Sequence, residues 1–131
     1  MKKALWIFGL VLPLVFLSAC GNKKPENTSD AMYQIGLNAV QAADDYIAGK
    51  LSGEEAYAKI EEYTSQANAQ YNREIQDTNA DTLVNTEFSN DTFILFDISS
   101  LSYQIMSAKH GSGAMSDVRK SRDKLAESLG K

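Results

Sequence analysis

Few side chains in this sequence have the types and spacing that enzyme or metal chemistry needs. Cys20 is the only cysteine and His110 the only histidine. His110 falls in a predicted turn, and no serine–acid arrangement is recognisable around it. A histidine at a helix end is usually exposed or interacts with the negative end of the helix dipole. We therefore expect no nucleophile–base pair and no metal ligand at His110.

Adjacent acidic residues occur three times, and each pair falls in a predicted helix. The pairs are Asp44–Asp45, Glu54–Glu55 and Glu61–Glu62. Neighbouring residues on a helix do not face each other, so the two carboxylates of a pair cannot converge on one metal ion or one substrate atom. The Glu-x-x-His pattern of carboxylate-bridged metal sites and the acid–glycine pattern of calcium loops are both missing. The sequence predicts a solvated acidic face, no metal, no cofactor and no enzymatic activity.

The amino-terminal segment has the order of a secretory signal peptide. Lys2 and Lys3 form a positive head, and an uncharged apolar run of 14 residues follows from Ala4 to Leu17. Signal peptides combine such a head with about 7 to 15 apolar residues and small residues at the cleavage site. A membrane-spanning helix, the alternative, needs about 20 apolar residues, and this run is shorter and contains Pro13. We expect residues 1–19 to be removed.

The residues Leu17-Ser18-Ala19-Cys20 resemble the lipobox of bacterial lipoproteins. The resemblance covers about the first twenty residues, and its cysteine is the only thiol of the chain. In that class, cleavage falls between the residues that correspond to Ala19 and Cys20, and the cysteine then carries acyl chains such as palmitate. The resemblance therefore implies a lipid anchor on Cys20, at the extracytoplasmic face of a cell membrane. Each buried CH₂ of such chains contributes about 0.8 kcal/mol to membrane binding.

Residues 20–29 are expected to be the lipidated cysteine and a polar tether. The nine residues from Gly21 to Ser29 include no apolar side chain, and they would span at most about 30 Å when extended. The folded domain is then expected over residues 30–131.

Charge is unevenly distributed along the chain, whose formal net charge is −4. Residues 25–97 contain 14 acids against three bases, whereas residues 98–131 contain three acids against six bases. An acidic body argues against nucleic acid as a partner, because phosphate contacts need clustered lysine and arginine. The one basic cluster is Arg119, Lys120, Arg122 and Lys124. We expect it to pair with the acidic helices of its own domain, and contact with an anionic membrane or wall polymer is the alternative.

Apolar residues recur every three or four positions after residue 30, which is the spacing of an amphipathic helix. The first helical face is made of Met32, Ile35, Ala39, Ala43 and Ile47. Gly49 is expected to end this helix, and Ser52 and Glu55 form a capping box that starts the next one. The second face consists of Tyr57, Ile60, Thr64, Ala67 and Tyr71. The short turn between the two helices predicts an antiparallel hairpin.

A second hairpin is expected from the carboxyl-terminal part of the chain. Ser89 suits the start of a third helix, and Ser112 is expected to cap a fourth. The buried face of the third helix should contain Ile94, Ile98, Leu101, Ile105 and Ala108, widened by Phe93, Leu95 and Phe96. A strand over Phe93–Ile98, which could pair with Leu83–Phe88 as a β-hairpin, is the alternative. The fourth helix has a sparse apolar face of Met115, Val118, Leu125 and Leu129.

Two such hairpins predict an all-α fold, a four-helix bundle. The turns at residues 49–53 and 109–113 both end in Ser-Gly, at an offset of 60 residues. Either a duplicated unit or convergence on the same turn chemistry would explain this similarity.

The expected function is that of a binding module. Held by lipid on Cys20, the bundle would bind another envelope protein or component, without catalysis of its own. The alternative is a carrier of a small molecule or peptide, with an apolar, tyrosine-lined cavity between the helices. Tyr57, Tyr71 and Phe96 are the ligand contacts that this alternative predicts.

Overall fold

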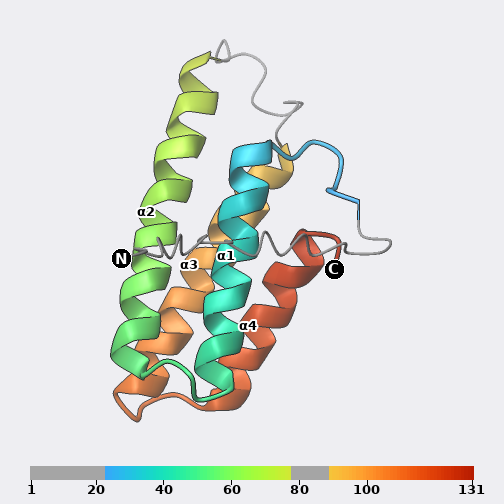
Figure 1. Cartoon of the computed structure of the whole chain (residues 1–131). Helices are drawn as coiled ribbons and strands as arrows, with labels where there is room; N and C mark the ends of the chain where they lie inside the picture. The colour runs from blue at the N-terminus through green and yellow to red at the C-terminus, as the bar shows by residue number, and fades with distance from the viewer. Residues whose placement is uncertain (1–22, 78–88) are drawn as a thin grey trace, which may run out of the picture.

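The computed structural model describes residues 23–77 and 89–131, which form four α-helices (Figure 1). They are α1 (Asp30–Ile47), α2 (Gly53–Asp77), α3 (Ser89–Lys109) and α4 (Met115–Ser128). No strand occurs in these two ranges, so Phe93–Ile98 is helical and the strand alternative is wrong for these residues. The predicted all-α fold is confirmed. The predicted signal peptide, Cys20 and the segment Leu83–Phe88 lie outside the described residues.

The helices pair in chain order as two antiparallel hairpins, which pack into one bundle (Figure 1). α2 packs against α1 and α3, and α4 packs against the same two helices from the other side. α1 and α3 also contact each other across the bundle. The four-helix bundle of two hairpins is therefore confirmed, with α1 and α3 as its inner pair.

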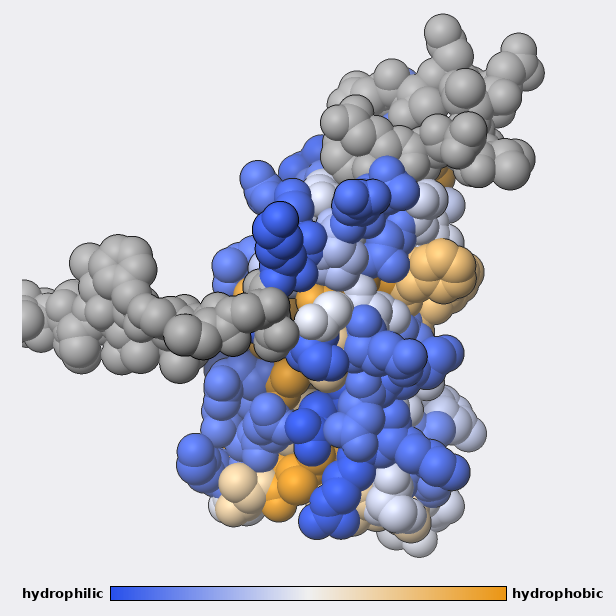
Figure 2. All heavy atoms as spheres, turned by 90° about the vertical axis from the view of Figure 1, so that its right-hand side faces the viewer, coloured by the Kyte–Doolittle hydropathy of each residue, from blue (hydrophilic) through white to orange (hydrophobic). Residues whose placement is uncertain are grey.

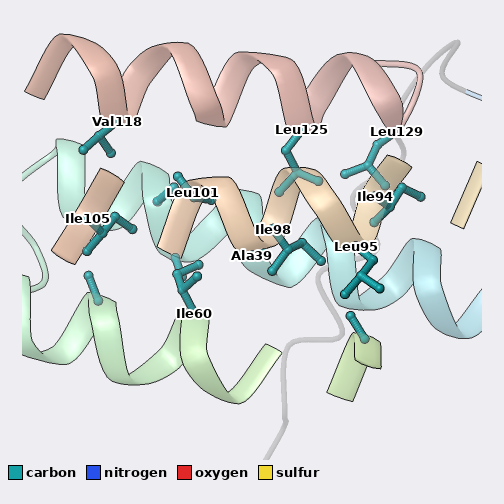
Figure 3. Close-up of a cluster of buried hydrophobic side chains, with 14 of the residues drawn as sticks. Ala39, Ile60, Ile94, Leu95, Ile98, Leu101, Ile105, Val118, Leu125 and Leu129 are labelled. Atoms are coloured by element: carbon teal, nitrogen blue, oxygen red, sulfur yellow. The ribbon is translucent and has the colours of Figure 1, made fainter. Parts of the chain in front are cut away.

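The core is one continuous group of aliphatic side chains from all four helices (Figure 3). Its largest fully buried members are Met32, Ile60, Ile94, Ile98, Leu101, Ile105, Leu125, Leu129 and Val118. α1 contributes mainly small residues. A Cβ atom on Gly36 would lie 2.7 Å from Leu129 Cδ2 and 3.2 Å from Ile94 Cγ2. α1 can therefore approach α3 and α4 closely only because position 36 has no side chain.

The capping box predicted for α2 is present. The Ser52 N–H donates to Glu55 Oε2 at 2.8 Å, and the Glu55 N–H donates to Ser52 Oγ at 3.2 Å. At the start of α1, the Met32 N–H donates to Ser29 Oγ at 3.1 Å. Both helices of the first hairpin therefore begin with a side chain that satisfies a free backbone N–H group.

The cap predicted for α4 is wrong. Ala114 occupies the position before α4 and makes no side-chain cap, while Ser112 Oγ donates to the Ser107 carbonyl at 3.2 Å. The turn folds back on α3, since a Cβ on Gly113 would lie only 2.7 Å from Ser107 Cβ. The Ser112 hydroxyl thus provides a hydrogen-bond donor for a carbonyl group in the last turn of α3. The similar Ser-Gly sequences of the two turns therefore have different structural roles.

Candidate functional site

Three large aromatic side chains stand out of the surface of α3. Phe93 is 62% exposed, Phe96 65% and Tyr103 61%. At about 100° per residue, all three fall on the side of α3 opposite to its buried residues. We call this group the α3 aromatic stripe. From Phe93 to Tyr103 it is ten residues long, or about 15 Å along the helix axis.

The structure corrects the prediction that Phe93 and Phe96 widen the buried face of α3. Ile94, Leu95 and Ile98 already occupy the inner side of the helix. Positions 93 and 96 point away from that side, because each lies outside the arc that faces α1, α2 and α4. α3 is therefore apolar on two sides, and within the described part of the chain only one side is covered.

The flank formed by α4 differs from the outer side of α3. Figure 2 shows this flank covered largely by hydrophilic residues, with small apolar patches between them. Arg122 pairs with Asp44 of α1 at 3.3 Å and with Asp123 at 3.1 Å. Lys124 pairs with Asp97 of α3 at 3.1 Å. Half of the predicted basic cluster thus pairs within its own domain, whereas Arg119 and Lys120 are exposed and form no ion pair with the described residues.

The structure does not bring the predicted ligand contacts Tyr57, Tyr71 and Phe96 into one site. Tyr57 is half-buried beneath the Lys109 ammonium group, which lies 5.1 Å from the ring centroid. Tyr71 is half-buried against the core, whereas Phe96 is exposed. Tyr57 and Tyr71 are fourteen positions apart on α2, which separates them by about 21 Å along the axis. One small ligand cannot contact both rings.

Two surface hollows follow the seam between α1 and α2, with volumes of about 300 and 380 Å³. Amide side chains line both hollows together with small or aliphatic and charged residues, and only Tyr63 is aromatic. Several of these amides already hydrogen-bond one helical turn away: Gln34 to Asn38, Gln41 to Asp45 and Gln70 to Glu74. The hollows therefore have mixed polar and apolar walls with a single aromatic side chain, unlike the tyrosine-lined cavity that a carrier was expected to have.

Two aspartates are buried in α3, and neither was predicted to be buried. Asp97 is 3% exposed and accepts a hydrogen bond from Ser128 Oγ at 2.6 Å, beside Lys124. Asp91 is fully buried and accepts hydrogen bonds from the Ser29 N–H at 3.0 Å and from Ser29 Oγ at 2.5 Å. Burial raises the pKa of Asp91 to about 7, Glu74 adds to that rise, and the Ser29 hydrogen bonds oppose it. Both carboxyl groups have hydrogen-bond partners. Through these partners Asp91 joins α3 to the residue before α1, and Asp97 joins α3 to α4.

Within residues 23–77 and 89–131, no three histidine, cysteine, aspartate or glutamate side chains lie close enough together to hold a metal ion. His110 is exposed in the turn after α3. Among the described residues, no helix has both the length and the apolarity needed to cross a membrane. Comparison of the chain with protein-family models, curated proteins and solved structures found no match.

Proposed function

We propose that the chain is a lipid-anchored lipoprotein whose helical bundle binds another protein of the cell envelope through the α3 aromatic stripe. The observation that carries this proposal is the exposure of Phe93, Phe96 and Tyr103, each above 60%, on one side of a helix whose other side forms the core. Neighbouring exposed aromatics of this kind mark interaction surfaces. The proposal includes no catalytic activity.

Aromatic residues suit a protein interface better than a solvated surface. Phe and Tyr supply a large apolar area with few rotatable bonds, so that little conformational entropy is lost on binding. They are also enriched at the centres of protein interfaces, where charged side chains are depleted. Positions 93, 96 and 103 carry no charge, and Ser100, which lies between them on the same side, is also neutral and exposed. The partner should present an apolar recess of matching length.

The anchor is tested by replacing Cys20 with serine. Because Cys20 is the only thiol in the chain, we expect Cys20→Ser to abolish labelling by a fatty-acid analogue and to leave unprocessed precursor. The mass of the intact native protein should correspond to a chain that begins at Cys20 and carries fatty acid. A native chain that still begins at Met1 and carries no fatty acid would overturn the anchor.

The interface is tested with a photoreactive amino acid at position 96, introduced in cells that make the full chain. We expect illumination to give one adduct of defined mass with a different protein. Phe93→Glu, which places a charge one turn away in the stripe, should reduce the yield several-fold. Lys120→Glu is the matched control, because Lys120 is exposed on α4 outside the stripe, and it should leave the yield unchanged. An adduct of twice the chain's mass, an adduct with lipid alone, or no adduct would contradict the proposed interface.

A further inference from the structure

The last residues of the predicted tether are attached to the bundle. The Asn90 N–H at the start of α3 donates to the Asn27 carbonyl at 3.0 Å. Asn90 Nδ2 donates to Thr28 Oγ1 and to the Ser128 carbonyl, each at 2.9 Å. Thr28 is only 5% exposed. The side chain of Asn90 thus joins this segment to the carboxyl-terminal end of α4.

Contacts continue on both sides of Asn27 and Thr28. Ser29 caps α1 and donates two hydrogen bonds to the buried Asp91. At the other end, a Cβ on Gly130 would lie 3.3 Å from the Lys23 carbonyl oxygen and 3.4 Å from Pro25 Cγ. Asn27 has a left-handed backbone conformation (φ 58°), which asparagine tolerates better than most residues, and this bends the segment. Residues 23–29 therefore lie on the ends of α1, α3 and α4 and behave as part of the domain.

This attachment leaves little chain between the domain and the anchor. Lys23 is three residues after Cys20. Three residues span at most about 10 Å, whereas a free segment of nine residues would reach about 30 Å. The geometry points to a domain held directly at the membrane surface: we propose that residues 23–29 stay docked in the lipidated protein and hold the carboxyl-terminal end of α4 beside the lipid headgroups.

The same short attachment limits how far from the membrane the partner can bind, and this step rests on the proposed function. α3 has 21 residues and is about 32 Å long. With about 10 Å of free chain, every point of the α3 aromatic stripe stays within about 40 Å of the bilayer. The stripe begins at Phe93, one helical turn after Asn90, which holds the docked segment. Its partner must therefore present its binding surface within about 40 Å of the same membrane.

Single introduced cysteines can measure this arrangement, because lipid occupies the natural thiol. A fluorophore is attached at Lys131→Cys, beside the docked segment, or at Ser112→Cys, in the turn at the other end of α4. The full lipidated protein is placed in phosphatidylcholine vesicles that contain a nitroxide-headgroup lipid. We expect several-fold stronger quenching at position 131 than at position 112. A flexible insertion of eight Gly and Ser residues between Asn22 and Lys23 should reduce the quenching at 131 to the level at 112.

The outcomes separate this inference from the proposed function. Equal quenching at the two positions in a protein whose intact mass includes the lipid would overturn the docked arrangement alone. Quenching at 131 that the insertion does not change would overturn it as well. Absence of lipid from the intact mass would instead overturn the proposed anchor. Stronger quenching at 131 that the insertion abolishes supports the short attachment.

Discussion

At the scale of single residues, Asp91 is the most unusual group in the bundle. It lies in the first turn of α3, where a carboxylate would ordinarily be solvated and favoured by the helix dipole. Here the side chain is fully buried between Ser29 and Glu74. Loss of hydration disfavours its charged form, and so does the neighbouring Glu74 carboxyl. The bundle therefore contains a carboxyl group that changes charge near neutral pH.

We expect the stability of the domain to depend on pH through Asp91. The pKa of Asp91 is about 7 in the folded protein, above its ordinary value of 3.8. The folded state therefore keeps a proton that the unfolded state has lost, and the stabilisation from this proton disappears as the pH rises towards 7. Relative to Asp91→Asn, the free energy of unfolding of the wild type should fall by on the order of 2 kcal/mol between pH 5 and pH 8.

Urea denaturation of soluble forms that begin at Gly21, followed by circular dichroism, measures this difference. Asp91→Asn is a suitable reference because the amide keeps an acceptor for the Ser29 N–H and a donor for Glu74, and it does not titrate. Profiles of the two proteins that run parallel from pH 5 to pH 8 would contradict the assignment.

Ser52 and Ser112 show how far helix caps can be predicted from single residues of the sequence. Ser52 caps α2 because Glu55, three residues later, reaches back to the Ser52 N–H. Ser112 lies two residues before the N-cap position of α4, which is Ala114, and its hydroxyl donates to α3 instead. A capping box was therefore predictable, whereas a lone serine before a helix was not sufficient.

At the scale of helices, the apolar periodicity located the buried faces well, but it did not show how wide the buried face of α3 is. Met32, Ala39 and Ala43 of α1 were predicted to be buried, and they are. α3 has apolar residues on two sides, so the spacing of Ile94 and Ile98 could not show that Phe93 and Phe96 lie outside. An apolar side of a helix ordinarily faces the core. The stripe is informative because α3 departs from that expectation.

Packing between helices depended on details that periodicity does not contain. Gly36 could be assigned to α1, but nothing in its neighbours along the chain indicates that Leu129 and Ile94 approach it. The partnership of Asp97 with Lys124 and Ser128 joins α3 to the end of α4 in the same way. Such contacts follow from the relative positions of helices, and these are determined only when the whole core is packed.

At the scale of the whole molecule, the question is where the domain begins. Polar composition indicated a tether up to Ser29, and α1 does begin at Asp30. The bonds that attach Asn27, Thr28 and Ser29 to the bundle use backbone groups, an amide and hydroxyls. Hydrogen bonds of this kind leave no apolar pattern in the sequence, so a docked polar segment and a free one look alike.

Two truncated soluble forms can locate the start of the domain. A form that begins at Asp30 loses the Ser29 cap, worth about 1 kcal/mol. It also loses the bonds to Asn90 and Asp91, each worth about 0.5–1.5 kcal/mol. We therefore expect its free energy of unfolding to be lower than that of the Gly21 form by on the order of 3 kcal/mol.

The matched control is a form that begins at Pro25. It keeps Asn27, Thr28 and Ser29 and loses the exposed Lys24–Asp30 ion pair and the approach of Lys23 to Gly130, so its free energy of unfolding should stay within about 1 kcal/mol of the Gly21 form. Urea denaturation at one pH compares the three proteins, each of which should unfold in a single cooperative transition. If the Asp30 form were as stable as the other two, residues 23–29 would add nothing to the fold. The domain would then be free to move away from the membrane on its full tether.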